Sequence, residues 1–274
     1  MIASVFTLGI NDIIVKGLSF KFPVWEIVFF RALSGVLVSI LLVIIFGLDS
    51  IRTKKPIGHI IRAFSAVACV VLFFFGIKLL LLAENQALFH SAPIIASILA
   101  VPILGEKIGF HRIIAVLIGF LGVLVILKPG TDLFNIYSLI SLGSGFFAAL
   151  TYLATRYLMA TETSISIIFY YSFALLFTSI FFISENFLMP SFSELVPLIS
   201  LGIVGSFGHY FASLAAKNAE VVIITPFEYS SFIFVTLLGY IFYNEIPDIT
   251  IYIGIILIFI SGVYIVYREQ KKYR

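Results

Sequence analysis

The stretch TPFEYSSFIFVTLLGYIFYNE, residues 225–245, places glutamates and hydroxyl side chains within an otherwise apolar segment. A helix of about 20 apolar residues crosses the hydrocarbon core of a bilayer, which is about 30 Å thick. Similar apolar runs follow one another along the 274-residue chain, of which 61% is hydrophobic and only 11% charged. Ordinary soluble domains contain about 45–50% apolar and about 25% charged residues. The sequence therefore predicts an all-α integral membrane protein.

Charged, glycine and proline residues divide the chain into ten apolar segments separated by short connections. We expect transmembrane helices at residues 2–19, 24–46, 58–79, 82–104, 110–128, 136–158, 164–183, 195–216, 220–243 and 249–267. These connections leave almost no chain for a soluble domain. Met1 leads directly into apolar sequence without a basic region or a cleavage site, so we expect the first segment to be retained.

The first half of the chain superimposes on the second when it is shifted by 139 or 140 residues. Five pairs of charged or polar residues then coincide: Lys16 with Arg156, Lys78 with Lys217, His90 with Tyr229, Glu106 with Glu245 and Lys128 with Arg268. Because each copy contains five helices, an odd number, the second copy enters the membrane from the opposite side. We therefore predict two inverted five-helix repeats, residues 1–130 and 131–274, the plan typical of secondary transporters.

Basic residues are concentrated in one set of connections, namely DSIRTKKP (49–56), EKIGFHR (106–112) and the tail YREQKKYR (267–274). The repeat equivalents of the first two, SENFLMPSFSELVP (184–197) and EIPDITI (245–251), contain no Lys or Arg. If both termini are cytoplasmic, 12 of the 17 Lys and Arg residues lie on or near the inner side. Because cytoplasmic loops carry an excess of Lys and Arg, we expect a multi-pass protein with both termini in the cytoplasm.

The pattern SAPIIASILAVPILGE (91–106), repeated loosely as EYSSFIFVTLLGYIFYNE (228–245), resembles the EamA family of the drug/metabolite transporter superfamily. The resemblance spans the whole chain. The stretches NDIIVKGLSFKFPVWEIVFFR (11–31) and TPFEYSSFIFVTLLGYIFYNEIPD (225–248) are similar to a bacterial branch associated with S-adenosylmethionine, riboflavin and related metabolites. This resemblance implies a bacterial inner-membrane protein with ten helices, and a central cavity lined largely by the third, fourth, eighth and ninth.

The chain departs from the family pattern at one position. Where the second repeat often has Glu-Pro thirteen residues before its terminal glutamate, this chain has Ser231-Phe232. Pro226, six residues before Phe232, is the alternative position for a helix break. Members of the family export amino acids, metallophores or drugs, and others import nucleoside-like metabolites. The resemblance therefore leaves both substrate and direction open.

Two predicted helices carry matching polar stripes. Residues at i, i+4 and i+11 share one face of a helix. On the fourth helix these are Gln86, His90 and Ser97, and their repeat equivalents on the ninth are Thr225, Tyr229 and Thr236. Polar side chains are costly in lipid, so we expect both stripes to face inward and to bind substrate. The alternative is that they only hydrogen-bond across helices, with His90 as an ordinary buried histidine instead of a proton carrier.

Two acidic residues near the helix ends have open roles. Glu228 lies about 8 residues into its helix, roughly 12 Å from the inner side at 1.5 Å per residue. It would bind a cationic substrate or carry a coupling proton, or else pair with Lys217 or Arg156. Glu84 lies at the outer end of the fourth helix, and we expect it to form an ion pair at the rim with Lys78.

Asp12, Lys16 and Arg31 in the first two helices are further candidates for charge pairing or coupling, together with Glu84. The i, i+4 spacing of Asp12 and Lys16 predicts that they pair with each other. Arg31 is expected to anchor its helix or to bind an anionic group. Glu106 and Glu245 close their segments at equivalent positions, and we expect each to cap the N-terminus of the next helix.

The remaining motifs argue against an enzyme. The chain contains no GxxxxGK[ST], HExxH or GxSxG motif, and its single cysteine, Cys69, lies in an apolar run. We therefore predict no catalytic residue, no metal, no cofactor and no nucleic-acid partner, in a monomer or homodimer embedded in the bilayer. The charged rings or filter loop expected of a pore are missing from the sequence too, although a pore or a structural membrane protein is the alternative class.

The favoured function is alternating-access transport of a small metabolite, driven by protons or by exchange and not by ATP. The substrate that we expect is an S-adenosylmethionine-like nucleoside. The grounds are the aromatic, weakly acidic face of the ninth helix and the similarity to the bacterial branch. The alternatives are export of amino acids, metallophores or drugs, or import of riboflavin.

Overall fold

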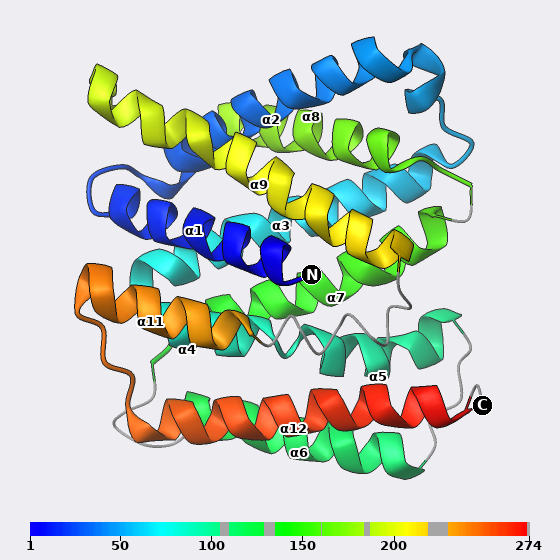
Figure 1. The fold of residues 1–274 in the computed structure, drawn as a ribbon, viewed down its shortest axis with the longest axis vertical. Helices are drawn as coiled ribbons and strands as arrows, with labels where there is room; N and C mark the ends of the chain where they lie inside the picture. Colours follow the sequence, from blue (N-terminus) through cyan, green and yellow to red (C-terminus); the bar gives the residue numbers. More distant parts are fainter. Residues whose placement is uncertain (105–109, 129–134, 160, 184–186, 219–229, 273–274) are drawn as a thin grey trace.

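The computed structural model describes the chain except residues 105–109, 129–134, 160, 184–186, 219–229 and 273–274, and the described part is built from helices (Figure 1). They are α1 (Ile2–Ser19), α2 (Val24–Phe46), the short 3-10 helix η1 (Leu48–Ile51), α3 (Pro56–Leu79), α4 (Leu82–Phe89), α5 (Ala92–Leu104), α6 (Phe110–Leu127), α7 (Ser138–Leu158), α8 (Ser164–Phe182), α9 (Phe192–Asn218), α11 (Ser231–Tyr243) and α12 (Ile249–Lys272). The prediction of an all-α protein is confirmed.

Five helices, namely α1, α2, α3, α7 and α8, are long and apolar enough to cross a membrane by length and composition. The described parts of four others contain shorter apolar helices. Large apolar side chains also cover the outside of the molecule, for example Phe177, Phe181 and Ile44, which are 77%, 79% and 73% exposed. An apolar surface of this extent needs a partner, and the bilayer supplies one.

The fourth predicted segment, residues 82–104, is not the single helix that we expected. α4 ends at Phe89, His90 leaves helical geometry with ψ near 5°, and α5 begins at Ala92. Pro93 explains the break, because it has no N–H to donate to the carbonyl of Phe89 and is favoured in the first turn of a new helix. Gln86 and Ser97 therefore lie on different helices, α4 and α5.

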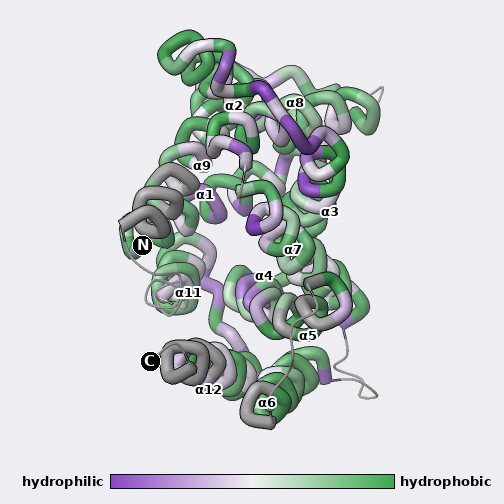
Figure 2. Tube along the Cα trace, turned by 90° about the vertical axis from the view of Figure 1, so that its right-hand side faces the viewer, coloured by the Kyte–Doolittle hydropathy of each residue, from purple (hydrophilic) through white to green (hydrophobic). Residues whose placement is uncertain are grey.

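The helices are stacked in layers (Figure 1). α2 and α8 form one edge, α6 and α12 form the opposite edge, and α1, α3, α4, α7, α9 and α11 lie between them. α3 packs on α7, α6 on α12, α2 on both α8 and α9, and α1 on α9. Hydrophilic residues of α1 and α4 lie toward the interior (Figure 2), in agreement with the burial of Asp12, Asn85 and His90. The polar groups are thus kept away from the lipid-facing surface.

Small residues bring two helix pairs into backbone contact. A Cβ atom added to Gly202 of α9 would lie 2.5 Å from the carbonyl oxygen of Arg31 and 2.8 Å from the amide nitrogen of Gly35 on α2. Gly122 of α6 and Gly254 of α12 likewise meet, since a Cβ on either would lie within 2.9 Å of the other's carbonyl oxygen. Close approach through small residues is a common way for helices to associate in a membrane.

We expect Gly202→Ala to lower the midpoint of thermal unfolding, because the added methyl group would meet backbone atoms that cannot rotate away. Overpacking of this kind costs about 1–3 kcal/mol. Gly143→Ala on α7 is the matched control, since its Cβ would meet only the Leu72 Cδ1 atom at 3.4 Å, and Ala favours a helix over Gly by about 1 kcal/mol. Equal unfolding midpoints for the two purified variants would contradict the close packing of α2 on α9.

Candidate functional site

His90 joins the two halves of the chain in the interior of the molecule. Its Nε2 atom lies 2.7 Å from Oγ of Ser231 at the start of α11 and 3.2 Å from Nε2 of Gln86. The His90 ring also packs edge-on against Phe232, with 4.9 Å between ring centroids. Gln86, His90 and Ser231 are all buried. The break between α4 and α5 places the imidazole at the end of α4, where it faces the first turn of α11.

Gln86 retains an unused hydrogen-bonding atom at this contact. Its side-chain oxygen Oε1 is buried and has no hydrogen-bond partner within the described part of the chain. Buried polar atoms in native proteins are nearly always paired with protein, water or a ligand. A molecule with a hydrogen-bond donor could therefore bind next to His90.

The predicted binding residues have different outcomes. The structure brings Gln86 and His90 together, as their i, i+4 spacing predicted. Thr236 is half-buried on α11, and the side chain of Ser97 lies outside the description, although its backbone is in α5. The remaining predicted residues, Thr225, Glu228 and Tyr229, lie outside the described residues. The expected approach of Tyr229 to His90 is thus untested.

Sequence reasoning missed Ser231 as a site residue. It was noted only because Ser231-Phe232 stands where the family pattern often has Glu-Pro. In the structure both residues contact His90, one by its hydroxyl group and the other by its ring. The departure from the pattern therefore coincides with the two residues of the second half that contact His90.

The predicted pair of Asp12 with Lys16 is wrong. Lys16 Nζ lies 2.9 Å from Oε1 of Glu245 and donates to the carbonyl oxygen of Leu80 at 2.6 Å. The side chains of Lys16 and Glu245 are only 8% and 10% exposed. The end of α11 and the turn before α4 supply two buried acceptors for the ammonium group. An i, i+4 pair on a helix surface contributes only about 0.2–0.5 kcal/mol, so a pair of Lys16 with Asp12 does not compete with these two buried acceptors.

The predicted capping role of Glu245 is correct in kind but wrong in its target. Its Oε2 atom accepts a hydrogen bond of 2.7 Å from the amide of Leu82, the first residue of α4, instead of capping the following helix α12. A carboxylate is favoured at a helix N-terminus, where unpaired N–H groups carry partial positive charge. Glu106 lies outside the described residues.

Arg31 holds the middle of α1 to α2. Its guanidinium Nη1 donates to Oδ1 of Asn11 at 2.8 Å. The guanidinium Cζ lies over the Phe74 ring, 5.2 Å from the ring centroid. Asn11 in turn donates to the carbonyl oxygen of Leu201 at 2.8 Å. Arg31 is also the cation whose charge acts on the buried Asp12. The anchoring role predicted for Arg31 is thus the one that the contacts support.

Glu84 does not form the ion pair that we expected at the rim. Its Oε1 atom accepts a hydrogen bond of 2.6 Å from Ser138 of α7, whereas the side chain of Lys78 is exposed. Glu84 and Ser138 line a small cavity of about 150 Å³ together with Lys128. The predicted pairing with Lys78 is wrong because the turn between α3 and α4 directs Glu84 toward α7.

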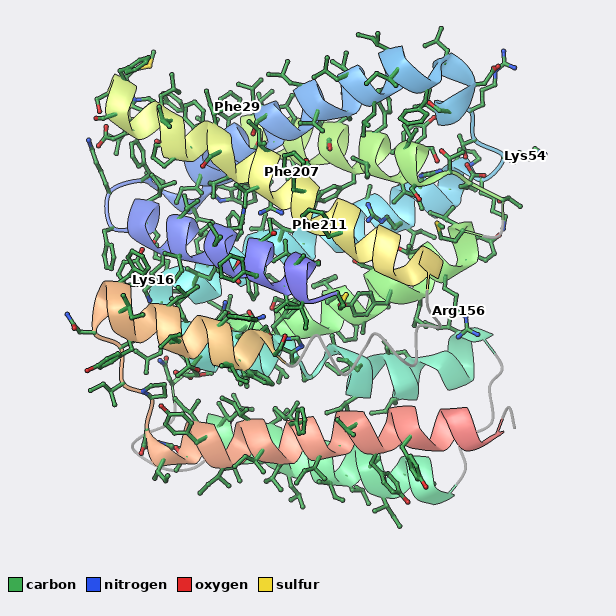
Figure 3. The ribbon with its side chains drawn as sticks, in the orientation of Figure 1. Lys16, Phe29, Lys54, Arg156, Phe207 and Phe211 are labelled. Atoms are coloured by element: carbon green, nitrogen blue, oxygen red, sulfur yellow. The ribbon has the colours of Figure 1, made fainter. Side chains whose placement is uncertain are left out.

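A second buried pair lies at the other end of the helices, where Figure 3 labels Lys54 and Arg156 opposite Lys16. His59 Nε2 lies 3.2 Å from Oε2 of Glu162, and Glu162 Oε1 accepts from the amide of Lys54 at 3.1 Å. Burial raises the pKa of Glu162, but its hydrogen bonds, chiefly that from His59, outweigh burial and hold the pKa below its ordinary value. No spacing in the sequence pointed to this pair, because its members are 103 residues apart.

A cavity of about 880 Å³ lies beside this second pair. One face of α3 lines it together with residues of α2, α7 and α8, and its lining includes His59, Trp25 and Tyr170. None of the predicted binding residues that the structure describes lines this cavity. Within the described ranges, no three His, Cys, Asp or Glu side chains are arranged to hold a metal ion.

The chain was compared with protein families, curated proteins and solved structures. The model of the EamA-like transporter family matches residues 1–128 and again residues 135–268. An S-adenosylmethionine uptake transporter of Rickettsia prowazekii (strain Madrid E) is 26% identical over 268 residues, which cover 98% of this chain and 91% of that protein. The Pseudopaline exporter CntI of Pseudomonas aeruginosa (strain UCBPP-PA14) is 28% identical over 258 residues, covering 93% and 90%. The chain also resembles a protein of known crystal structure, with a TM-score of 0.62 and 18% sequence identity over 99% of both chains. This likeness supports the fold alone.

We expect Glu245→Gln to destabilise the protein strongly, because it leaves the buried ammonium group of Lys16 without its counter-charge. Breaking a buried pair in this way costs about 3–5 kcal/mol. Asp248→Asn is the matched control, since Asp248 pairs with Lys128 but is 52% exposed, and such pairs contribute about 0–1 kcal/mol. Thermal unfolding of both variants in the same detergent is the measurement. A loss for Glu245→Gln no larger than that for Asp248→Asn would show that the Lys16 pair does not hold the helices together.

Proposed function

Because the chain belongs to the EamA-like transporter family, we propose that it is a secondary transporter that carries a small metabolite across a bacterial inner membrane by alternating access. The family match confirms the resemblance inferred from residues 91–106 and 228–245, and transporter-named relatives indicate that the protein is not an enzyme. The observation that carries the proposal is the buried contact of His90 with Ser231. It places hydrogen-bonding groups between the two halves, where inverted-repeat carriers bind substrate.

The packing of the helices supports two inverted five-helix repeats. A shift of 139 or 140 residues relates α1 to α7, α2 to α8, α3 to α9 and α6 to α12. The pairs α2 with α8 and α6 with α12 each bring equivalent helices together, and the contact of α3 with α7 has its equivalent in that of α9 with α1. Such matched contacts are expected when two copies are related by a pseudo-twofold axis in the membrane plane.

The orientation rests on the two ends of the helices. Lys54 and Arg156 lie at one end and Lys16 at the other (Figure 3). Since the end with the basic loops faces the cytoplasm in most membrane proteins, both termini are cytoplasmic and the Lys16 end faces outward. Active alkaline phosphatase fused after Tyr267 would contradict this orientation.

Ion pairs at the two ends provide a route to alternating access. Lys16 of the first half and Glu245 of the second form an ion pair in this structure, at the end to which we assign the outer side. Their repeat equivalents in the sequence are Arg156 and Glu106, which the predicted topology assigns to the inner end. In a carrier built from inverted repeats, one of these pairs separates while the other is formed. Transport that persisted with positions 16 and 245 covalently cross-linked would exclude this route.

An S-adenosylmethionine-like nucleoside is the favoured substrate. The supporting observations are the name of the Rickettsia relative and the mixture of ring and hydrogen-bonding groups around His90. The substrate contacts that we assign are Gln86, His90, Ser97, Thr225, Glu228, Tyr229 and Thr236, with Ser231 added by the structure. Metallophore export is the second candidate, because the Pseudomonas relative is similar to the chain to the same degree.

Purified protein in liposomes is expected to show saturable, counterflow-competent uptake of labelled S-adenosylmethionine. The uptake should depend on a proton gradient or on internal counter-substrate and not on ATP, because the chain has no phosphate-binding loop. Competition with unlabelled flavins, amino acids and metallophores serves as the specificity control. Displacement by one of these compounds but not by adenosyl compounds would replace the substrate, and flux without saturation would indicate a pore.

His90→Phe and Ser231→Ala are expected to weaken substrate binding by about two- to tenfold, the equivalent of a lost hydrogen bond of about 0.5–1.5 kcal/mol. Both changes keep the helices intact, so the unfolding midpoint should change little by comparison. The matched control is Ser179→Ala, because Ser179 is a buried serine that donates only to Leu176 of its own helix. Reduced stability with unchanged affinity in both variants would mean that the contact only joins helices.

A further inference from the structure

The cavity of about 880 Å³ is a groove on the outside of the helix stack, separate from the His90 contact. Its lining comes from α2, the loop before α3, α3, α7 and α8, and includes no residue of α4 or α11. Ile60 and Phe64 belong to the lining and are 67% and 66% exposed, so the groove opens toward the surface that faces lipid. The groove lies between helices of both halves, and the substrate contacts assigned around His90 do not account for it.

We propose that this groove binds one acyl chain of an anionic phospholipid, with the headgroup held by the basic loop of residues 52–55. The site goes beyond the transport function and does not depend on the identity of the substrate. The site has two parts, an apolar channel and a cationic end. The lining of the groove supports the first, and the exposed lysine of the loop before α3 supports the second.

The channel has the shape and polarity of a binding site for an acyl chain. α3 lines it from Pro56 to Leu72, about 24 Å at 1.5 Å of rise per residue. One leaflet of a bilayer core is about 15 Å deep, so an acyl chain can lie within the groove through the whole leaflet. Small residues, Ala63 and Ala68 on α3 and Ala174 on α8, leave the space open. Trp25 lines the groove and stacks on Phe182 with 4.6 Å between ring centroids.

The end of the groove at Thr53 and Pro56 lies next to exposed positive charge. Lys54 is exposed, and within the described part of the chain its ammonium group has no ion pair. Its backbone amide is fixed by Glu162, which holds the loop in place. Lys55 donates to the carbonyl oxygen of Tyr157 at 3.1 Å, which leaves other ammonium protons available. A basic residue near the membrane surface attracts anionic lipid with a strength of about 1 kcal/mol.

His59 adds a hydrogen-bonding group at the same end. Its ring lines the groove, and while Nε2 contacts Glu162, the buried Nδ1 atom has no partner among the described residues. Tyr170 packs against the His59 ring, with 4.5 Å between centroids, and also lines the groove. The polar groups of a lipid headgroup and glycerol backbone would meet these side chains at the depth where the acyl chain begins.

The test measures lipid binding to the purified full-length protein by native mass spectrometry and by the shift in unfolding midpoint. Phosphatidylglycerol is expected to bind saturably and to raise the midpoint more than phosphatidylcholine with the same acyl chains. Lys54→Gln should weaken phosphatidylglycerol binding about fivefold, the equivalent of about 1 kcal/mol. Lys78→Gln, which removes an exposed charge at the opposite end of α3, is the matched control and should bind as the parent does.

The double variant Ala68→Leu with Ala174→Leu fills the groove from both walls and should abolish the saturable binding of both lipids. Ala68→Leu alone is the milder variant if the double one does not fold, and Ala3→Leu, at an exposed position on α1, is its control. Equal binding of the two lipids, unchanged binding in a folded groove variant, or equal protection by glycerol 3-phosphate would overturn the proposal. Displacement of the lipid by the transported substrate would also overturn it and assign the groove to transport.

Discussion

The buried pair of Lys16 with Glu245 connects three parts of the chain that are far apart in sequence. The ammonium group reaches the carbonyl oxygen of Leu80 while the carboxylate accepts from the amide of Leu82, so the end of α1, the turn before α4 and the end of α11 meet at two side chains. Removing two charges from water is costly, and the cost is offset only when the remaining hydrogen-bonding capacity is also used. Here it is used by the backbone at the start of α4.

The same requirement explains why charged and amide side chains of the helices lie in the interior and the outside is apolar. In hydrocarbon a polar group has no water to bond, so Asn11, Arg31 and Asp12 lie between the helix layers. Arg31 bonds to Asn11, and Asn11 to the backbone of α9, which ties α1, α2 and α9 together. Glycines at the contact of α9 with α2 then allow the backbones to approach. The burial of polar groups and the close packing of helices therefore support each other.

The buried pairs at the two ends of the molecule differ in chemistry. At one end a lysine and a glutamate from opposite halves are in contact, and at the other the pair is His59 with Glu162. The pair of Lys16 with Glu245 lies where α4 begins and α11 ends. The interior contact of His90 with Ser231 joins the opposite ends of the same two helices. Movement at the pair of Lys16 with Glu245 would thus change the geometry around His90.

The sequence by itself determined the helical membrane fold, nearly all the helix positions and the family, because hydrophobic runs and punctuation are local properties of the chain. It also placed Gln86 and His90 on one face. Only the tertiary structure decided which groups pair: Lys16 with Glu245 and not Asp12, Glu84 with Ser138 and not Lys78, and His90 with Ser231. Sequence spacing measures neighbours along one helix, whereas a polar group taken out of water selects the partner that replaces its lost water, and that partner came from a distant part of the chain in each case.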